Sequence, residues 1–473
     1  MRAIIAQLCY SAPTASHIQI SMLNRRHFLQ SIAAAAVTPV VTQACATTHA
    51  AQSHLVSDPG KIFDLPPGFS YTVVSRAGAE MSDGLQMPGK HDGMAAFAGE
   101  NGRIRLVCNH EIMPEDTVYN GLRDRFSTLP EAIKAKFYDR GGDRTPGLGG
   151  TTTTIYNPAT GETERQFLSL GGTELNCAGG PTPWGSWLSC EECFEWAGDI
   201  EYFGKPAARR DQWHGYVFEV SAASDELVQA VPIKGMGRFE HEACAVDETT
   251  GIVYMTEDRF HSLFYRYIPD TPGDLLAGGK LQALVADGQP SLATHNWTST
   301  PSVQLGDPLP AHWIDFDEPN PLEDTLRLEG EHRGAATFAR GEGLCAAGDR
   351  FAFACTNGGP ARLGQIFTYK PMSANGGELE LIAESQQDSL LRNADNLTMA
   401  PWGDLIVCED TSSHCGLVGI RPDGSQYAIG DNAHTRSEMA GVCFSPDGET
   451  LFVNIQHPGM TIAITGPWGT LHS

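Results

Sequence analysis

The sequence predicts an all-β protein, a six-bladed β-propeller with loop insertions between its blades. Two observations carry this prediction. The chain contains 51 Gly and 29 Pro among 473 residues, a composition that favours many short strands and turns over long helices. It also repeats one hairpin-like pattern along its length, which is typical of propeller architectures.

The repeated pattern begins near a carboxylate or amide and continues with small and apolar residues. A turn at Gly, Pro or Asp follows, and then a strongly apolar strand that ends in polar residues. The six copies cover residues 92–111, 171–192, 241–258, 340–357, 395–410 and 438–456. Their spacing varies, so insertions lie between them. Each copy is predicted to be the inner hairpin of a four-stranded blade.

Other segments are expected to supply the outer strands of the blades, among them residues 151–172 and 214–222. A hairpin returns the chain to the side on which it began. The polar ends of all six hairpins should therefore meet at one mouth of the central channel, and the turns should lie at the other. Solvated strand ends are the alternative interpretation of a single copy, but six copies favour a site.

Carboxylates crowded at a channel mouth repel one another, and they must bind cations or take up protons. Carboxylate and amide oxygens favour hard ions, chiefly calcium. Cys177 opens its hairpin at the position where other copies carry Asp or Glu. A thiolate there makes a softer or trivalent metal such as iron plausible beside calcium. A small buried thiol that only packs remains the alternative for Cys177.

The N-terminus contains a segment that resembles a twin-arginine export signal, with Arg25 and Arg26 before an Ala/Val stretch. Met22 is the expected start of translation. The apolar stretch is too short to span a membrane as a helix. Cys45 lies in an Ala-Cys-Ala sequence, which is read either as a cleavage site or as a lipid-anchor site.

Export would involve the twin-arginine machinery and place the protein in the periplasm or outside the cell. The domain expectation follows: an upstream extension and signal over residues 1–50, and one propeller domain over residues 51–473. The formal net charge of −25 argues against a nucleic-acid partner, which requires a basic face. A monomer is expected.

The motifs resemble those of the PhoX family of alkaline phosphatases. The resemblance covers residues 60–460 and rests on the twin-arginine segment and on the sequences DGMAAF…NHE, NCAGGPTPWGSWLSCEE, HEA…YMTED, RGEG and DNLTMAPWGDLIVCED. It implies a six-bladed propeller whose iron–calcium cluster hydrolyses phosphomonoesters. The chain is shorter than well-known members, whose longer insertions shape the substrate pocket.

The resemblance also implies roles for individual residues. Cys177 would bind iron, and Arg340 would grip the phosphate of a small phosphorylated substrate. Carboxylates expected to hold iron or calcium are Glu111, Glu192, Glu242 and Glu342. Further candidates are Asp92, Asn109, Asn396, Glu409 and Asp410. The division of these residues between Ca²⁺ and Fe³⁺ stays open.

Two other functions are alternatives for this sequence. One is a different calcium-dependent propeller hydrolase that acts on phosphodiesters or lactones, and the other is a non-catalytic, calcium-stabilised binding propeller. Cys177 together with Arg340 favours an enzyme. No serine occupies a G-x-S-x-G setting, which disfavours covalent serine chemistry. His110 and His241 precede motif carboxylates and are read as acid–base groups or, alternatively, as packing histidines.

Overall fold

The computed structural model describes residues 54–114, 116, 120–122, 125–202 and 205–472. The predicted twin-arginine segment and Cys45 lie outside these residues. Within the described part, none of the helices combines the length and the apolar character needed to cross a membrane. Strands dominate, as the composition predicts. The helices are α3 (Glu131–Lys134) and α4 (Leu326–His332), with short 3-10 turns at η1 (Glu100–Gly102), η2 (Phe126–Thr128), η3 (Gly141–Asp143), η4 (Lys234–Met236) and η5 (Trp468–His472).

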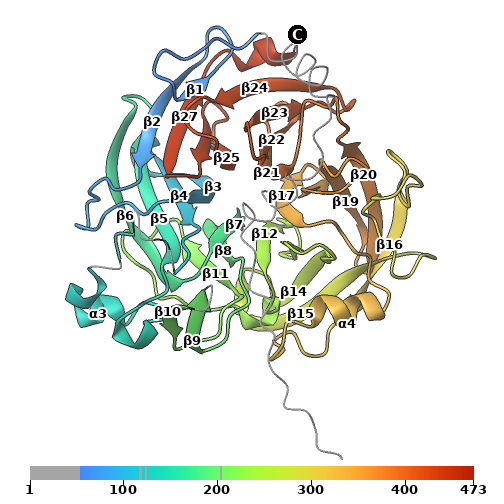
Figure 1. Cartoon of the computed structure of the whole chain (residues 1–473), viewed down its shortest axis with the longest axis horizontal. Coiled ribbons are helices and arrows are strands. Elements are labelled where there is room, and N and C mark those ends of the chain that lie inside the picture. The colour runs from blue at the N-terminus through green and yellow to red at the C-terminus, as the bar shows by residue number, and fades with distance from the viewer. Residues whose placement is uncertain (1–53, 115, 117–119, 123–124, 203–204, 473) are drawn as a thin grey trace, which may run out of the picture.

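The strands are arranged around a central axis in a propeller-like fold (Figure 1). Two sheets contain four strands. The first is β3 (His91–Ala98), β4 (Ile104–His110), β5 (Gly149–Asn157) and β6 (Glu162–Thr173); the second is β2 (Ser70–Arg76), β27 (Met460–Thr465), β26 (Leu451–Ile455) and β25 (Met439–Phe444). A five-stranded sheet orders β1 (Phe63–Asp64), β24 (Gln426–Asn432), β23 (Gly416–Ile420), β22 (Leu405–Glu409) and β21 (Ala394–Met399).

The remaining strands form three sheets of very different size. A three-stranded sheet orders β11 (Val217–Ser221), β8 (Ser186–Glu191) and β7 (Asn176–Pro181), and a separate ribbon pairs β9 (Gly198–Tyr202) with β10 (Lys205–Arg210). A nine-stranded sheet orders β12 (His241–Val246), β13 (Val253–Glu257), β14 (Tyr265–Thr271), β15 (Asp274–Ala286), β16 (Leu309–Asp315), β20 (Gly376–Glu384), β19 (Gln365–Ser373), β18 (Arg350–Cys355) and β17 (Gly341–Ala347).

The prediction of six separate four-stranded blades is therefore wrong in that form. Four sheets of three to five strands stand separately around the axis, and the fifth large sheet has nine strands. The physical reason is β16, which pairs with β15 on one edge and with β20 on the other. A strand that hydrogen-bonds on both edges joins two units that would otherwise be separate.

All six predicted hairpins are present as antiparallel strand pairs: β3–β4, β7–β8, β12–β13, β17–β18, β21–β22 and β25–β26. The first strand of each hairpin contacts the first strand of the next, and β25 contacts β3. The predicted outer segments are β5–β6 and β11. The ring is closed by strands from the start of the chain, since β2 pairs with β27 and β1 pairs with β24.

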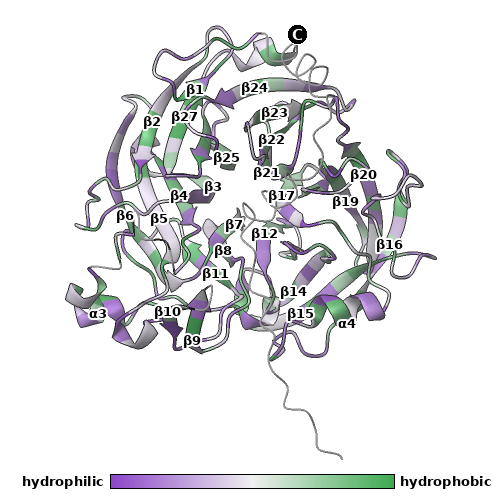
Figure 2. Cartoon of the chain, in the orientation of Figure 1, coloured by the Kyte–Doolittle hydropathy of each residue, from purple (hydrophilic) through white to green (hydrophobic). Residues whose placement is uncertain are grey.

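Apolar residues fill the spaces between neighbouring sheets. One cluster, with Phe264, Phe338 and Phe353, packs between the two halves of the nine-stranded sheet, and another packs Ile406 and Val453 between β22 and β26. Figure 2 shows apolar colouring along the strands and hydrophilic colouring where β12 begins near the axis. The core therefore lies between the sheets, and polar side chains gather at the inner strands.

The inner strands approach one another so closely that some positions require glycine. A Cβ atom on Gly180 of β7 would lie 1.9 Å from the carbonyl oxygen of Cys244 in β12. Gly185, in the turn between β7 and β8, meets no atom within 4 Å but has a φ of +84°. The first glycine is required by packing and the second by backbone conformation.

These two glycines give a matched test of the ring packing. We expect Gly180→Ala to lower the free energy of unfolding by about 3 kcal/mol or more, since β7 and β12 must separate to admit the methyl group. Gly185→Ala should cost only about 1–2 kcal/mol, the usual penalty for a left-handed backbone. Denaturant unfolding measures both, and equal losses would contradict the close approach of β7 and β12.

Candidate metal centre

Five inner strands carry a metal-ligand candidate at the same structural position. The residue that follows the first paired residue of the strand is Asp92, Cys177, Glu242, Glu342 or Asp395, and in each strand the register shifts there. A β-bulge of this kind bends the strand and re-aims a side chain. The sixth inner strand, β25, shifts its register after Ala440, and Glu438 precedes it. The repeated bulge thus directs side chains from separate strands to one mouth.

These side chains form three groups, and in each group the ligand atoms lie within 4.8 Å of one another. The groups are Cys177–Glu192–Glu242, Glu242–Glu342–Asp395 and Asp92–Glu111–Glu438. Glu242 belongs to two of them, so the first two groups are adjacent. All members are buried except Glu438, which is half-buried. The donor sets fit cations: one group combines a thiol with two carboxylates, and the other two offer only oxygen.

The structure brings together Cys177 and most carboxylates predicted from the motifs. Asp395 and Glu438 join them, although sequence reasoning did not select these two as ligands. Both stand at the beginning of a repeated hairpin, at or beside the position that Asp92 and Glu242 occupy in theirs. Alignment of the hairpins by their first polar residue would have found them.

The paired carboxylates at the hairpin ends divide into two roles. The first member of each pair is the last residue of its strand, and it accepts a hydrogen bond from a backbone N–H group at or before the start of the next strand. These bonds are Gly215 N to Glu191 at 2.8 Å, Leu263 N to Glu257 at 3.2 Å and Gly416 N to Glu409 at 3.1 Å. Successive side chains of a strand point to opposite sides. The second member, such as Glu192, therefore points away from this backbone contact.

Glu409 follows this division and belongs to none of the three groups. Its two oxygens accept hydrogen bonds from Arg392 N at 2.8 Å and Gly416 N at 3.1 Å. Burial raises the pKa of Glu409 to about 7, against the opposing effect of these two bonds. Asp410 is also outside the groups. Glu409 thus links the segment before β21 to the start of β23 through these two hydrogen bonds.

The two candidate asparagines connect neighbouring inner strands. Nδ2 of Asn109 donates to the carbonyl oxygens of Cys177 at 3.1 Å and Ala178 at 2.7 Å. Oδ1 of Asn396 accepts from the backbone N–H of Gly441 at 2.7 Å, and its Nδ2 donates to Asp395 at 3.1 Å. Asn109 holds β7 against β4, and Asn396 holds β21 against β25.

The Cys177 thiol is buried among carboxylates. Its Sγ lies 3.4 Å from the carbonyl oxygen of His241. Burial raises the pKa of Cys177 well above its ordinary value, and the charges of Glu242 and Glu192 raise it further. A thiolate in this place therefore requires a cation beside it, because a nearby positive charge is what favours the ionised form.

The rings of His110 and His241 are buried and contact neighbouring groups of the protein. His110 lies between Gly89 O and Thr152 Oγ1, each at 2.9 Å, and burial lowers its pKa to about 4. His241 stacks on Phe239 with ring centroids 3.6 Å apart, and burial lowers its pKa to about 3. Both rings are neutral near pH 7, and these contacts face the protein interior.

Arg340 stands at the start of β17, next to the second group. Its Nε and one Nη each donate to Asp258 at 2.7 Å, and the same Nη lies 3.2 Å from Glu342. Arg340 has a φ of +58°, a strained conformation for a residue with a side chain. The bidentate pair with Asp258 fixes the plane of the guanidinium group at the mouth.

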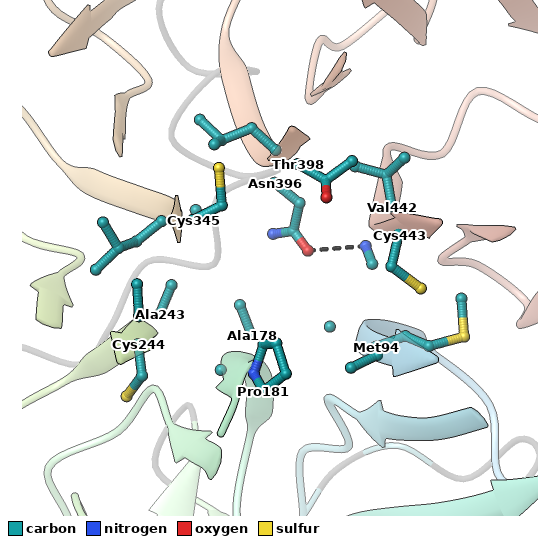
Figure 3. Close-up of a pocket in the computed structure, with 18 of the residues that line it drawn as sticks. Met94, Ala178, Pro181, Ala243, Cys244, Cys345, Asn396, Thr398, Val442 and Cys443 are labelled. Carbon is teal, nitrogen blue, oxygen red and sulfur yellow. Dashed lines mark hydrogen bonds between the residues drawn. The ribbon is translucent and has the colours of Figure 1, made fainter. Parts of the chain in front are cut away.

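A cavity of about 220 Å³ continues along the inner strands from the ligand-bearing positions. Small and apolar residues dominate its wall, among them Ala178, Ala243 and Val442, and Asn396 supplies its amide (Figure 3). The lining contains no Asp, Glu, Lys or Arg among the described residues. The charged chemistry is therefore confined to the mouth.

A pH series tests the raised pKa that burial gives Glu409. A carboxyl with a raised pKa favours folding most below its ordinary value of 4.5 and loses that contribution as pH rises through about 7. We expect the wild type to lose stability relative to Glu409→Gln over this interval, because glutamine cannot ionise. Denaturant unfolding at each pH, with metal content unchanged, checks this. Parallel pH profiles for the two proteins would contradict it.

The family model described as alkaline phosphatase PhoX matches residues 51–459. Pseudomonas fluorescens PhoX in complex with vanadate, a transition state analogue, is 19% identical with a TM-score of 0.64, and the match covers 86% of this chain and 97% of that chain. This likeness shows a shared fold. No curated protein sequence matches.

Two further solved structures are more distant. A gluconolactonase from Xanthomonas campestris is 11% identical over 84% of this chain and 95% of its own, with a TM-score of 0.39. A virginiamycin B lyase from Staphylococcus aureus is 12% identical over 84% and 99%, with a TM-score of 0.35. Neither bears on function. The family model spans most of the chain, which confirms the resemblance seen in the motifs: the protein belongs to the alkaline phosphatase PhoX family and is a phosphoric monoester hydrolase.

Proposed function

We propose that this protein hydrolyses phosphomonoesters at an iron–calcium centre in the mouth of its propeller channel. The observation that carries the proposal is the convergence of one thiol and seven carboxylates in three compact groups. Such a concentration of buried negative charge is stable only with cations or protons. Membership of the PhoX family supports the phosphomonoester as substrate.

The donor chemistry supports a division of the metals. The group with Cys177, Glu192 and Glu242 would hold iron, because a thiolate ligand suits a softer or more highly charged transition metal. The groups that contain only carboxylates would hold calcium, which takes oxygen ligands. Glu242 would be shared between an iron and a calcium position. Glu409 and Asp410 are left out of the proposed ligand set.

Bound cations would supply Lewis acidity that neutralises the phosphoryl oxygens of a dianionic ester. Arg340 would bind the same phosphoryl group through its planar guanidinium, which suits phosphate geometry. Asp258 orients Arg340 for this role, and Glu342 keeps it beside the carboxylate groups. The neutral His110 and His241 take no part in proton transfer in this proposal.

We further propose that the nine-stranded sheet comprises two blades, β12–β15 and β17–β20, joined through β16. This division makes six blades in one domain over residues 51–473. Export through the twin-arginine route and a monomeric state remain proposals that rest on the sequence alone.

Replacement of the thiol gives the sharpest test of the proposed centre. We expect Cys177→Ala to remain folded, to lose most of its iron and to hydrolyse a phosphomonoester at least about 100-fold more slowly, as for loss of a dominant electrostatic contribution. Elemental analysis and assays with a phosphomonoester, a phosphodiester and a lactone measure this. Wild-type activity confined to the diester or the lactone would overturn the proposal.

Cys408→Ala is the matched control, because Cys408 is fully buried in an apolar cluster with Ile406 and Leu417. It should lose about 1–2 kcal/mol of stability and keep its iron and turnover. If Cys177→Ala likewise keeps its iron and its turnover, Cys177 only packs in the core and the proposed iron ligand is wrong.

Arg340→Lys tests the phosphate-binding role. Lysine keeps the charge but lacks the planar fork, so we expect kcat/KM for a phosphomonoester to fall by about 100-fold with metal content unchanged. Arg333→Lys is the control, since Arg333 forms a partly exposed ion pair with Glu329 at the end of α4. A value of kcat/KM within twofold of wild type for Arg340→Lys would contradict the role.

A further inference from the structure

Three fully buried ionisable side chains, Asp139, Glu191 and His214, form a chain of contacts behind the first metal group. Nδ1 of His214 lies 2.6 Å from Glu191 Oε1, and Nε2 lies 3.2 Å from Asp139 Oδ2. Both ring nitrogens face carboxylate oxygens, which only accept hydrogen bonds when ionised. The imidazole therefore bridges Glu191 and Asp139, with one ring nitrogen against each carboxylate.

The Glu191 carboxylate also accepts hydrogen bonds from three backbone N–H groups. Oε1 also accepts the N–H of Glu174 at 3.0 Å, and Oε2 accepts those of Gly215 at 2.8 Å and Tyr216 at 3.1 Å. These bonds join the turn before β7 to the segment that enters β11. Loss of the carboxylate would leave three buried N–H groups without their acceptor, which is costly.

The turn held by Glu191 is strained and leads directly to the metal group. Leu175 in this turn has a φ of +44°, a conformation that residues with a side chain seldom adopt. The carbonyl oxygen of Leu175 accepts the backbone N–H of Glu192 at 3.0 Å. Cys177 follows Leu175 by two residues, so the same turn sets the positions of Cys177 and Glu192.

Asp139 fixes the other side of His214. Its carboxylate accepts backbone N–H groups of Gly141 at 2.7 Å and of Asp211 and Gln212 at 2.8 Å each. The equivalent carboxylates in other hairpins lack such support: Glu257 and Glu409 have no histidine hydrogen-bond partner within the described part of the chain. The histidine–aspartate pair therefore occurs behind the hairpin that carries the thiol.

We propose that Asp139, His214 and Glu191 are positioning residues that hold Cys177 and Glu192 at the separation a bound cation requires. The inference rests on the proposed function, because it assumes that this group binds a metal. Residues that support metal ligands typically change metal affinity by about 10–100-fold when replaced. Their effect should appear in metal retention, independently of the assay for activity.

The experiment uses the full chain, refilled with iron and calcium after treatment with a chelator. We expect His214→Gln to release iron to excess chelator about 10–100-fold faster than wild type, as followed by elemental analysis over time. Asp139→Asn should accelerate release in the same direction. Arg266→Gln is the control, because Arg266 is also buried but bonds to Gln282 on β15 and to Ala374 in the turn between β19 and β20. It should lower the melting temperature with wild-type iron release.

Wild-type iron retention in folded His214→Gln would overturn the inference and leave the proposed function intact. Equal acceleration by Arg266→Gln would also overturn it, because the effect would then reflect general destabilisation. If His214→Gln fails to fold, the release rate of Asp139→Asn decides in the same way. A wild-type protein that takes up neither metal would overturn the proposed function itself, and the inference with it.

Discussion

Mutual repulsion of buried carboxylates is the constraint on which the rest of the structure depends. Seven carboxylates and one thiol converge with ligand atoms within 4.8 Å inside each group. At these separations like charges repel strongly in a protein interior. The folded backbone holds them together all the same, through a bulge repeated in each inner strand and through hairpins that return to the same mouth. The cost of this crowding is what makes the mouth a candidate for cation binding.

At three hairpin ends, two adjacent carboxylates lie in different surroundings. Glu191, Glu257 and Glu409 face backbone N–H groups and fasten one strand to the next. Of their sequence neighbours, Glu192 belongs to a ligand group and Asp258 pairs with Arg340. Alternation along a strand makes this division automatic, because adjacent side chains point to opposite sides. In the pair Glu191–Glu192, adjacent acidic residues therefore have different surroundings: backbone N–H groups for the first and other candidate ligands for the second.

Closure of the ring decides whether the third group exists. Asp92 and Glu111 belong to the first hairpin, whereas Glu438 belongs to the last. Gln456, from the end of the last hairpin, donates to Asp92 at 2.9 Å and to Glu111 at 2.6 Å. The pairing of β2 with β27 brings these chain segments together. The third group, Asp92, Glu111 and Glu438, therefore forms only when the first and last hairpins lie side by side.

The sequence by itself determined the hairpins, their polar ends, the thiol at Cys177 and the family, because each of these is a local pattern of residue types. The tertiary structure alone decided how the ligands group, that β16 merges two units into one sheet, and that Glu409 fastens backbone. It also revealed Asp139 and His214, which lie 75 residues apart in segments without a shared motif. These features depend on contacts between distant segments, and local patterns contain no information about which distant side chains meet.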